Sequence, residues 1–139
     1  HRLYFDAFVI QDGQSVMELT PEWRASEILS LAESHGSGWL VPPHHPERWA
    51  EEPEHRAWIS RRATSHPLKT LQDRISLTGA CEKVPATFAL SSKFEPSPFW
   101  QFYERYQGQP GWRTVKIPTM HDAMISMPEQ VCEILVSAL

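Results

Sequence analysis

The sequence predicts an α/β fold built on a parallel sheet, and three apolar segments predict its strands. Residues 3–10 are aromatic and β-branched with little alternation, and residues 85–90 and 112–117 have a similar character. Continuous apolar runs of this kind are typical of strands buried on both faces, as strands are in parallel sheets. The segments between and after them have helical patterns, which supply the crossover connections that parallel strands require.

The first strand contains a charged residue, Asp6, and is followed by a polar turn over residues 11–15. A carboxylate inside an apolar run is costly to bury unless it is paired. We therefore expect Asp6 to lie near the end of the strand or to have a partner.

Residues 14–84 are predicted to form a mainly helical insert. Thr20 is the expected N-cap of one helix and Gly36 its end, and a second helix is expected at about residues 54–64. Ligands of parallel α/β folds bind at the C-terminal edge of the sheet, so we expect the insert to cover that edge as a cap. The predicted organisation is a core strand and turn over residues 1–13, a cap over residues 14–84, and core strands, a loop and a C-terminal helix over residues 85–139.

Two helices are expected after the second strand. Ser97 begins an aromatic helix that continues to Tyr106. The last helix is predicted from Ser126 and Glu129, which have the spacing of a capping box. Its expected apolar face consists of Val131, Ile134, Leu135 and Leu139.

Composition narrows the classes of function. The chain has 139 residues, 41% hydrophobic and 22% charged, which is typical of one soluble globular domain. A net charge of -4 and the lack of a basic stripe argue against binding to nucleic acid. No apolar run approaches the roughly 18 residues of a membrane span, so no membrane partner is expected. Cys81 and Cys132 match no metal or redox spacing and are expected to be reduced thiols of a cytoplasmic protein.

One histidine has the position of a catalytic base. His121 lies a few residues after the third predicted strand and before the last helix, so we expect it at the C-terminal edge of the sheet. Histidine titrates near neutral pH, which suits a general base. His44, His45 and His55 are not expected to bind a metal, because adjacent histidines rarely converge on one ion and no ligand spacing accompanies them.

Several segments, in chain order, carry a resemblance that covers nearly the whole chain. They are Tyr4–Val9 with Asp12–Ser15, Gly38–Pro43, His66–Thr70, Pro85–Phe99 and Met120–Gln130. Together they resemble the α/β-hydrolases of the small esterase and hydroxynitrile lyase-like group. The resemblance implies the sixth and seventh strands, the cap, the histidine loop and the final helix of that fold, which make up its C-terminal half.

The resemblance also implies a serine-dependent hydrolase, in which the order along the chain is serine, acid, histidine. The serine of such enzymes lies in a Gly-x-Ser-x-Gly turn, which this sequence lacks; Gly36-Ser37-Gly38 does not have the spacing. We therefore expect the nucleophile and the N-terminal half of the fold on an upstream segment or a separate chain. The 139 residues alone are expected to be inactive, to supply His121 as the base, and to need no cofactor.

The acid partner of His121 is left open between three residues. In many relatives it follows the strand over residues 85–90, but here serine stands at the aligned position and Glu95 comes later. Asp6 is the favoured acid, because a buried carboxylate at the end of its strand would orient the imidazole. Asp122 is the third candidate, although neighbouring loop side chains usually diverge and its alternative role is to cap the loop.

The predicted reaction is hydrolysis of a small, apolar carboxylic ester. The candidate walls of the substrate pocket are Trp23, Trp39 and Trp58, each of which is otherwise a core residue. Two alternatives remain. A hydroxynitrile lyase-like carbon–carbon lyase would use a lysine near the histidine, whereas Ala123 and Met124 stand there. A non-catalytic ligand-binding receptor of the same fold would lack the nucleophile.

Overall fold

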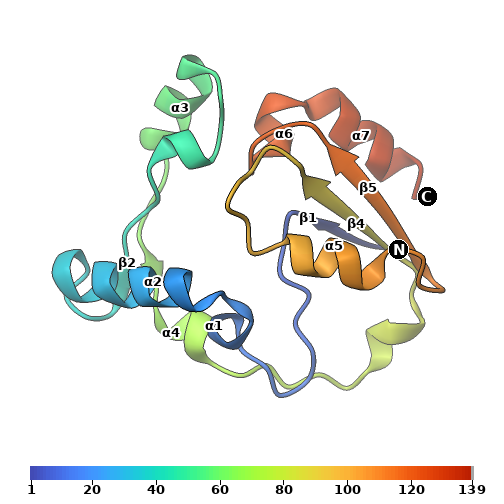
Figure 1. Ribbon diagram of the computed structural model, residues 1–139, viewed down its shortest axis with the longest axis horizontal. Coiled ribbons are helices and arrows are strands. Elements are labelled where there is room, and N and C mark those ends of the chain that lie inside the picture. The colour runs from blue at the N-terminus through green and yellow to red at the C-terminus, as the bar shows by residue number, and fades with distance from the viewer. Residues whose placement is uncertain (139) are drawn as a thin grey trace. The chain divides into compact units, whose positions relative to one another are not determined.

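The computed structural model describes residues 1–138, and the chain divides into two compact units (Figure 1). The second unit consists of Ile10–His44 and Arg62–Gly79. The first unit consists of the rest of the described chain and contains the sheet. None of the helices within residues 1–138 is long and apolar enough to cross a membrane.

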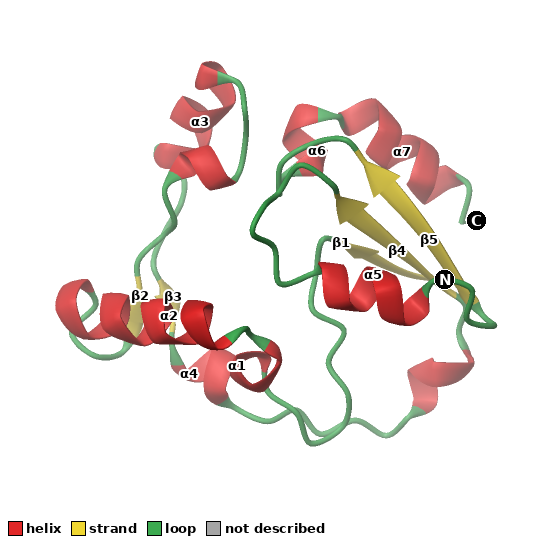
Figure 2. Cartoon of the chain, viewed as in Figure 1, coloured by secondary structure: helices red, strands yellow, loops and turns green. Residues whose placement is uncertain are grey.

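The first unit is built on a three-stranded sheet within the described residues. Its strands are β1 (Arg2–Phe5), β4 (Ala86–Ser91) and β5 (Trp112–Ile117), in the order β1-β4-β5 (Figure 2). Both pairings are parallel. The predicted parallel α/β class is therefore confirmed, and the third strand has the bounds expected from its apolar run.

The first strand is shorter than the apolar run that predicted it. It ends at Phe5, because Asp6 has a φ of 44° and turns the chain out of the extended conformation. The left-handed region is uncommon for residues other than glycine, and aspartate is among those that tolerate it best. Asp6 therefore lies at the end of its strand, as its cost of burial predicted.

Helices cover both faces of the sheet. Helix α5 (Trp100–Tyr106) lies on one face of the sheet (Figure 1). There Phe102 contacts Phe88 of β4, with ring centroids 6.1 Å apart. Helices α6 (Ala123–Ser126) and α7 (Pro128–Val136) lie on the other. There the buried cluster consists of Ala89, Ile117, Ala123, Val131 and Ile134. Alternation along β4 thus sends Phe88 and Ala89 to opposite faces.

Three further elements complete the first unit. They are the 3-10 helix η1 (Pro46–Arg48), helix α3 (Pro53–Ser60) and the 3-10 helix η2 (Ala80–Lys83). Proline stands in the first turn of η1 and α3, where its missing N–H has no intrahelical partner to lose.

The second unit is mainly helical. It contains α1 (Val16–Leu19), α2 (Glu22–His35) and α4 (Lys69–Gln72), with the antiparallel pair β2 (Leu40–Val41) and β3 (His66–Pro67). Its buried cluster consists of Ile28, Ala32, Val41 and Leu68. Helix α2 ends where predicted, with Gly36 as its C-cap. Glycine is required at this position because a Cβ would lie 1.7 Å from the Leu40 carbonyl oxygen.

Two predicted helix caps are wrong. Thr20 donates its hydroxyl to the Val16 carbonyl, 2.8 Å away, and Pro21 is the N-cap of α2. Helix α7 begins after Met127 without a side-chain cap, and within residues 1–138 the buried Ser126 hydroxyl has no hydrogen-bond partner. The proline at the start of each helix moves the boundary, since it fixes a helical φ at its own position and disfavours helix just before it.

The predicted apolar face of the last helix is partly right. Val131 and Ile134 are buried, whereas Leu135 is 41% exposed, and Leu139 lies outside the described residues. The short elements α1, α4 and α6 and the two-residue strands were not predicted, because so few residues show no periodicity.

Phe102→Ala is expected to lower the free energy of unfolding by about 3–5 kcal/mol, because the side chain is fully buried between α5 and the sheet. Glu104→Ala, at an exposed position of the same helix, is the matched control and should change it by less than about 0.5 kcal/mol. Urea unfolding measures both. Equal effects of the two substitutions would contradict the packing described for α5.

Candidate active site

Three parallel strands bring their C-terminal ends to one edge of the sheet. Asp6 directly follows β1, Ser91 is the last residue of β4, and His121 comes four residues after the end of β5. Strand β4 lies between the other two. One polar residue at or just after the end of each strand therefore lies at this edge of the sheet, although the three residues are far apart in the sequence.

Asp6 and His121 form the central pair of the site. His121 Nδ1 lies 2.7 Å from Asp6 Oδ2, and the side chains are 22% and 1% exposed, respectively. An ionised carboxylate only accepts hydrogen bonds, so Nδ1 carries the proton and donates it. In the neutral ring, Nε2 then has a free lone pair, and among residues 1–138 it has no hydrogen-bond partner. This is the tautomer that a general base requires.

The Asp6 carboxylate is held by its second oxygen as well. The Ser91 N–H donates to Oδ1 at 3.1 Å, and the Asp6 N–H donates to the Ala89 carbonyl at 2.8 Å. Both carboxylate oxygens and the backbone of Asp6 are therefore tied to β4 or to the imidazole. The position of Asp6 is fixed before any substrate binds.

Burial and hydrogen bonding shift the pKa of Asp6 in opposite directions. Burial raises the pKa of Asp6 above its ordinary 3.8, while the hydrogen bond and charge of His121 and the Ser91 N–H oppose that rise. Burial also raises the pKa of Asp122, with His121 lowering it and Asp6 raising it. The imidazole thus has two carboxyl groups near it, of which only Asp6 is hydrogen-bonded to it.

Three aromatic rings surround the imidazole. Phe99 is nearly parallel to it at 5.4 Å and 10°, Phe94 lies at 5.1 Å and 37°, and Trp49 lies at 4.9 Å and 59°. Sequence reasoning did not find these neighbours. No spacing relates them to His121, because they come from the segment near η1 and from the loop between β4 and α5.

The other acid candidates have different surroundings. Glu95 is exposed, and within residues 1–138 it makes no hydrogen bond or ion pair with His121. Asp122 stands at the N-cap position of α6 without a side-chain cap hydrogen bond. Asp6 is the candidate that the structure brings to His121.

The predicted pocket residues are all exposed on the described chain. The exposed fractions of Trp23, Trp39 and Trp58 are 46%, 60% and 43%. Trp23 and Trp39 belong to the second unit and Trp58 to the first. Their part in a substrate pocket stays a prediction.

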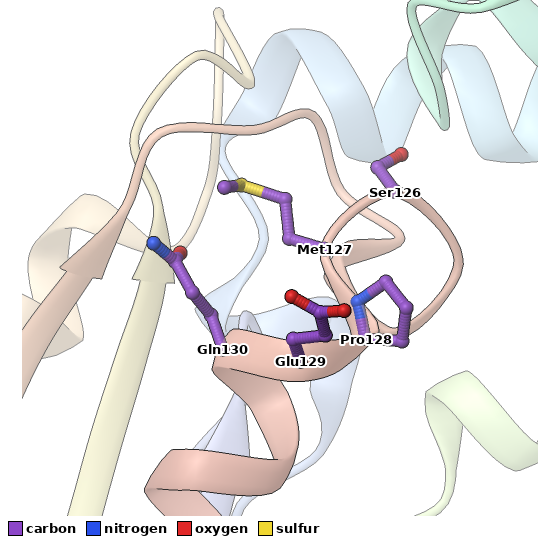
Figure 3. A pocket seen from close by; sticks show the side chains of 5 residues that line it. All are labelled: Ser126, Met127, Pro128, Glu129 and Gln130. Carbon is purple, nitrogen blue, oxygen red and sulfur yellow. The ribbon is translucent and has the colours of Figure 1, made fainter.

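His44 and His55 have polar partners of their own, and a cavity lies at the start of α7. Within residues 1–138, no group of three His, Cys, Asp or Glu side chains could hold a metal ion. His44 contacts Arg24 and His55 pairs with Glu52. A cavity of about 350 Å³ beside the start of α7 is lined by Ser126, Met127, Pro128, Glu129 and Gln130 (Figure 3). None of these was predicted to act in catalysis.

The raised pKa of Asp6 predicts a pH dependence of stability. The folded protein holds this proton more tightly than the unfolded chain, so stability is lost as the pH rises from 3.8 through the folded pKa. Asp6→Asn removes this ionisation and keeps an oxygen that can accept from Ser91. Urea unfolding across this window should therefore show the wild-type protein losing more stability than the variant as the pH rises. Parallel curves would contradict the raised pKa.

Comparison with known proteins finds an esterase that is similar to this chain in sequence. The chain is 32% identical to a carbendazim-hydrolysing esterase of Nocardioides sp. (strain SG-4G), in an alignment that covers 94% of the chain and 57% of the esterase. No protein-family model matches it.

One solved structure is similar to this chain in its fold. It is an extracellular α/β-hydrolase from a Paenibacillus species, described as sharing structural and functional homology with tobacco salicylic acid binding protein 2. It matches 98% of the chain and 60% of its own length, with a TM-score of 0.76 and 17% identity. The chain thus spans somewhat more than half the length of the esterase and of the Paenibacillus hydrolase. It therefore contains part of the α/β-hydrolase fold and is homologous to an esterase.

Proposed function

We propose that this chain supplies the base and the acid of a serine hydrolase that acts on small, apolar carboxylic esters. The observation that carries the proposal is the His121–Asp6 hydrogen bond of 2.7 Å at the C-terminal edge of a parallel sheet. His121 is the general base, and Asp6 fixes its tautomer and stabilises the imidazolium. Homology to an esterase supports the choice of an ester as substrate.

The reaction needs a nucleophile that these 139 residues do not provide in the expected motif, because no Gly-x-Ser-x-Gly occurs in them. The proposed serine belongs to the remainder of the fold, on the same or a separate chain. The match to only 57% of the esterase and 60% of the hydrolase structure is consistent with this division.

The proposed chemistry proceeds in two halves. The serine oxygen attacks the ester carbonyl while His121 Nε2 takes the serine proton, and the tetrahedral intermediate collapses as the imidazolium returns that proton to the leaving alcohol. Water then attacks the acyl-serine, with Nε2 accepting a water proton and returning it to the serine oxygen. Nδ1 keeps its hydrogen bond to Asp6 throughout, so the positive charge of the ring is stabilised next to the carboxylate.

The substrate pocket is proposed to include Trp23, Trp39 and Trp58, carried by the predicted cap over residues 14–84. Their exposed indole rings offer apolar surface that an apolar acyl or alcohol group would cover.

A nitrophenyl ester assay and a fluorophosphonate probe, applied to the protein that combines this chain with its nucleophile, test the function. His121→Ala is expected to lower kcat by on the order of 10⁶-fold, because loss of the base disables the whole triad. Asp6→Asn should lower it by roughly 10⁴-fold, because the imidazole loses its correct tautomer. Glu95→Gln is the matched control and should leave the rate unchanged.

The possible results distinguish a hydrolase from a non-catalytic receptor and test whether Asp6 is the acid. Labelling of a serine together with turnover that depends on His121 supports the hydrolase. Absence of labelling and of turnover in the complete protein would exclude it and favour a receptor. Equal activity of Asp6→Asn and the wild type would show that another residue is the acid.

The pocket proposal has its own test. Trp39→Ala is expected to raise KM for an apolar ester and to leave kcat nearly unchanged, because an apolar wall binds the ground state and the transition state about equally. Steady-state kinetics with esters of increasing chain length measure the effect. Unchanged KM across the series would remove Trp39 from the pocket.

A further inference from the structure

We infer that Trp49 is a positioning residue for His121, and that the segment of residues 46–51, here called the Trp49 segment, holds the histidine loop in its working geometry. The inference rests on the proposed function, since it concerns how the proposed base is oriented. It adds a residue that no sequence pattern connects with the site.

Trp49 contacts the histidine loop through its backbone. Its carbonyl oxygen accepts a hydrogen bond of 3.0 Å from the Asp122 N–H, the peptide directly after His121. On the other side, the His121 carbonyl accepts from the Ser91 hydroxyl at 3.4 Å. The two hydrogen bonds tie the two polar groups of the His121–Asp122 peptide to the Trp49 segment and to β4, which restrains the backbone next to the proposed base.

Trp49 also contacts the imidazole itself. Its indole lies 4.9 Å from the imidazole centroid at 59°, while Phe99 lies nearly parallel to the imidazole at 5.4 Å. The hydrogen bond to Asp6 fixes one nitrogen but leaves the ring able to rock about that contact. Rings packed at two different inclinations oppose that motion, so Nε2 keeps one direction for proton transfer.

The Trp49 segment is fixed to the loop after β4 by residues on both sides of the tryptophan. Arg48 donates to the Pro96 carbonyl at 3.1 Å, and its guanidinium lies 5.1 Å from the centroid of the Phe94 ring. Glu51 pairs with Lys93 at 2.8 Å. Exposed ion pairs contribute little individually, but these contacts act together with Ala50, whose exposed fraction is 0%. The indole is therefore presented to His121 from an anchored support.

Positioning predicts a specific kinetic pattern. Trp49→Leu is expected to lower kcat by roughly 10- to 100-fold with little change in KM, because misplacing a catalytic group by about 1 Å has an effect of this size. Trp49→Phe keeps an aromatic ring and should recover most of kcat. Trp112→Leu is the matched control. It removes an indole that stacks on Tyr106 at 3.7 Å at the opposite end of β5, so it should lower stability and leave kcat per folded molecule unchanged.

The NMR signals of the His121 ring protons provide a readout that does not depend on turnover. Ring currents of the neighbouring aromatics displace these signals, so Trp49→Leu should move and broaden them while Trp112→Leu leaves them in place. The NMR readout therefore distinguishes a failure of the proposed function from a failure of the inference about Trp49. A protein without esterase activity whose His121 signals respond to Trp49 contradicts the proposed function but supports the contact. Esterase activity with unmoved signals contradicts the inference alone.

Two kinetic outcomes would overturn the inference, and a second variant covers the case in which the first does not fold. A raised KM with unchanged kcat in Trp49→Leu would place the indole against substrate instead of the base. Equal losses of kcat in Trp49→Leu and Trp112→Leu would make the effect one of general stability. If Trp49→Leu does not fold, Arg48→Met releases the segment without touching the indole. Its kcat should fall several-fold relative to wild type, and an unchanged kcat with unmoved His121 signals would refute the anchoring.

Discussion

The hydrogen bond between His121 Nδ1 and Asp6 Oδ2 is the interaction on which the arrangement of this chain depends. It spans the sheet edge from the end of β1 to the loop after β5, and β4 contributes the Ser91 N–H to the same carboxylate. A carboxylate on a side chain that is only 1% exposed is tolerable only with such partners. Parallel strand order, strand length and the turn at Asp6 together place those partners within reach.

Sequence reasoning recovers those parts of the fold whose signal is local. Apolar runs mark the strands of the sheet, and an aspartate inside one of them already signals a paired carboxylate. The position of His121 between a strand and a helix places it at the same edge. The cap assignments of Thr20 and Ser126 fail because each helix begins one residue later than predicted, with Pro21 and Met127 as the N-caps. Local motifs therefore predict helices better than helix boundaries.

The parts of the site that could not be predicted are those set by tertiary contact. Phe94, Phe99 and Trp49 surround the imidazole, yet each has a local pattern typical of an ordinary core aromatic. Sequence reasoning favours Asp6 over Glu95 as the acid, but only the tertiary structure shows that Asp6 is buried and 2.7 Å from His121 Nδ1 while Glu95 is exposed.

The strand order has a consequence for the synthesis of the protein. The edge of β1 that faces β4 has no partner until about 80 further residues have been made, which takes on the order of ten seconds at roughly 5–20 residues per second. The second unit has its own buried cluster and lies between the two strands in the sequence, so it can collapse in that interval. During that interval the unpaired edge of this aromatic strand is open to pairing with another chain, an exposure that follows from the order of the sheet.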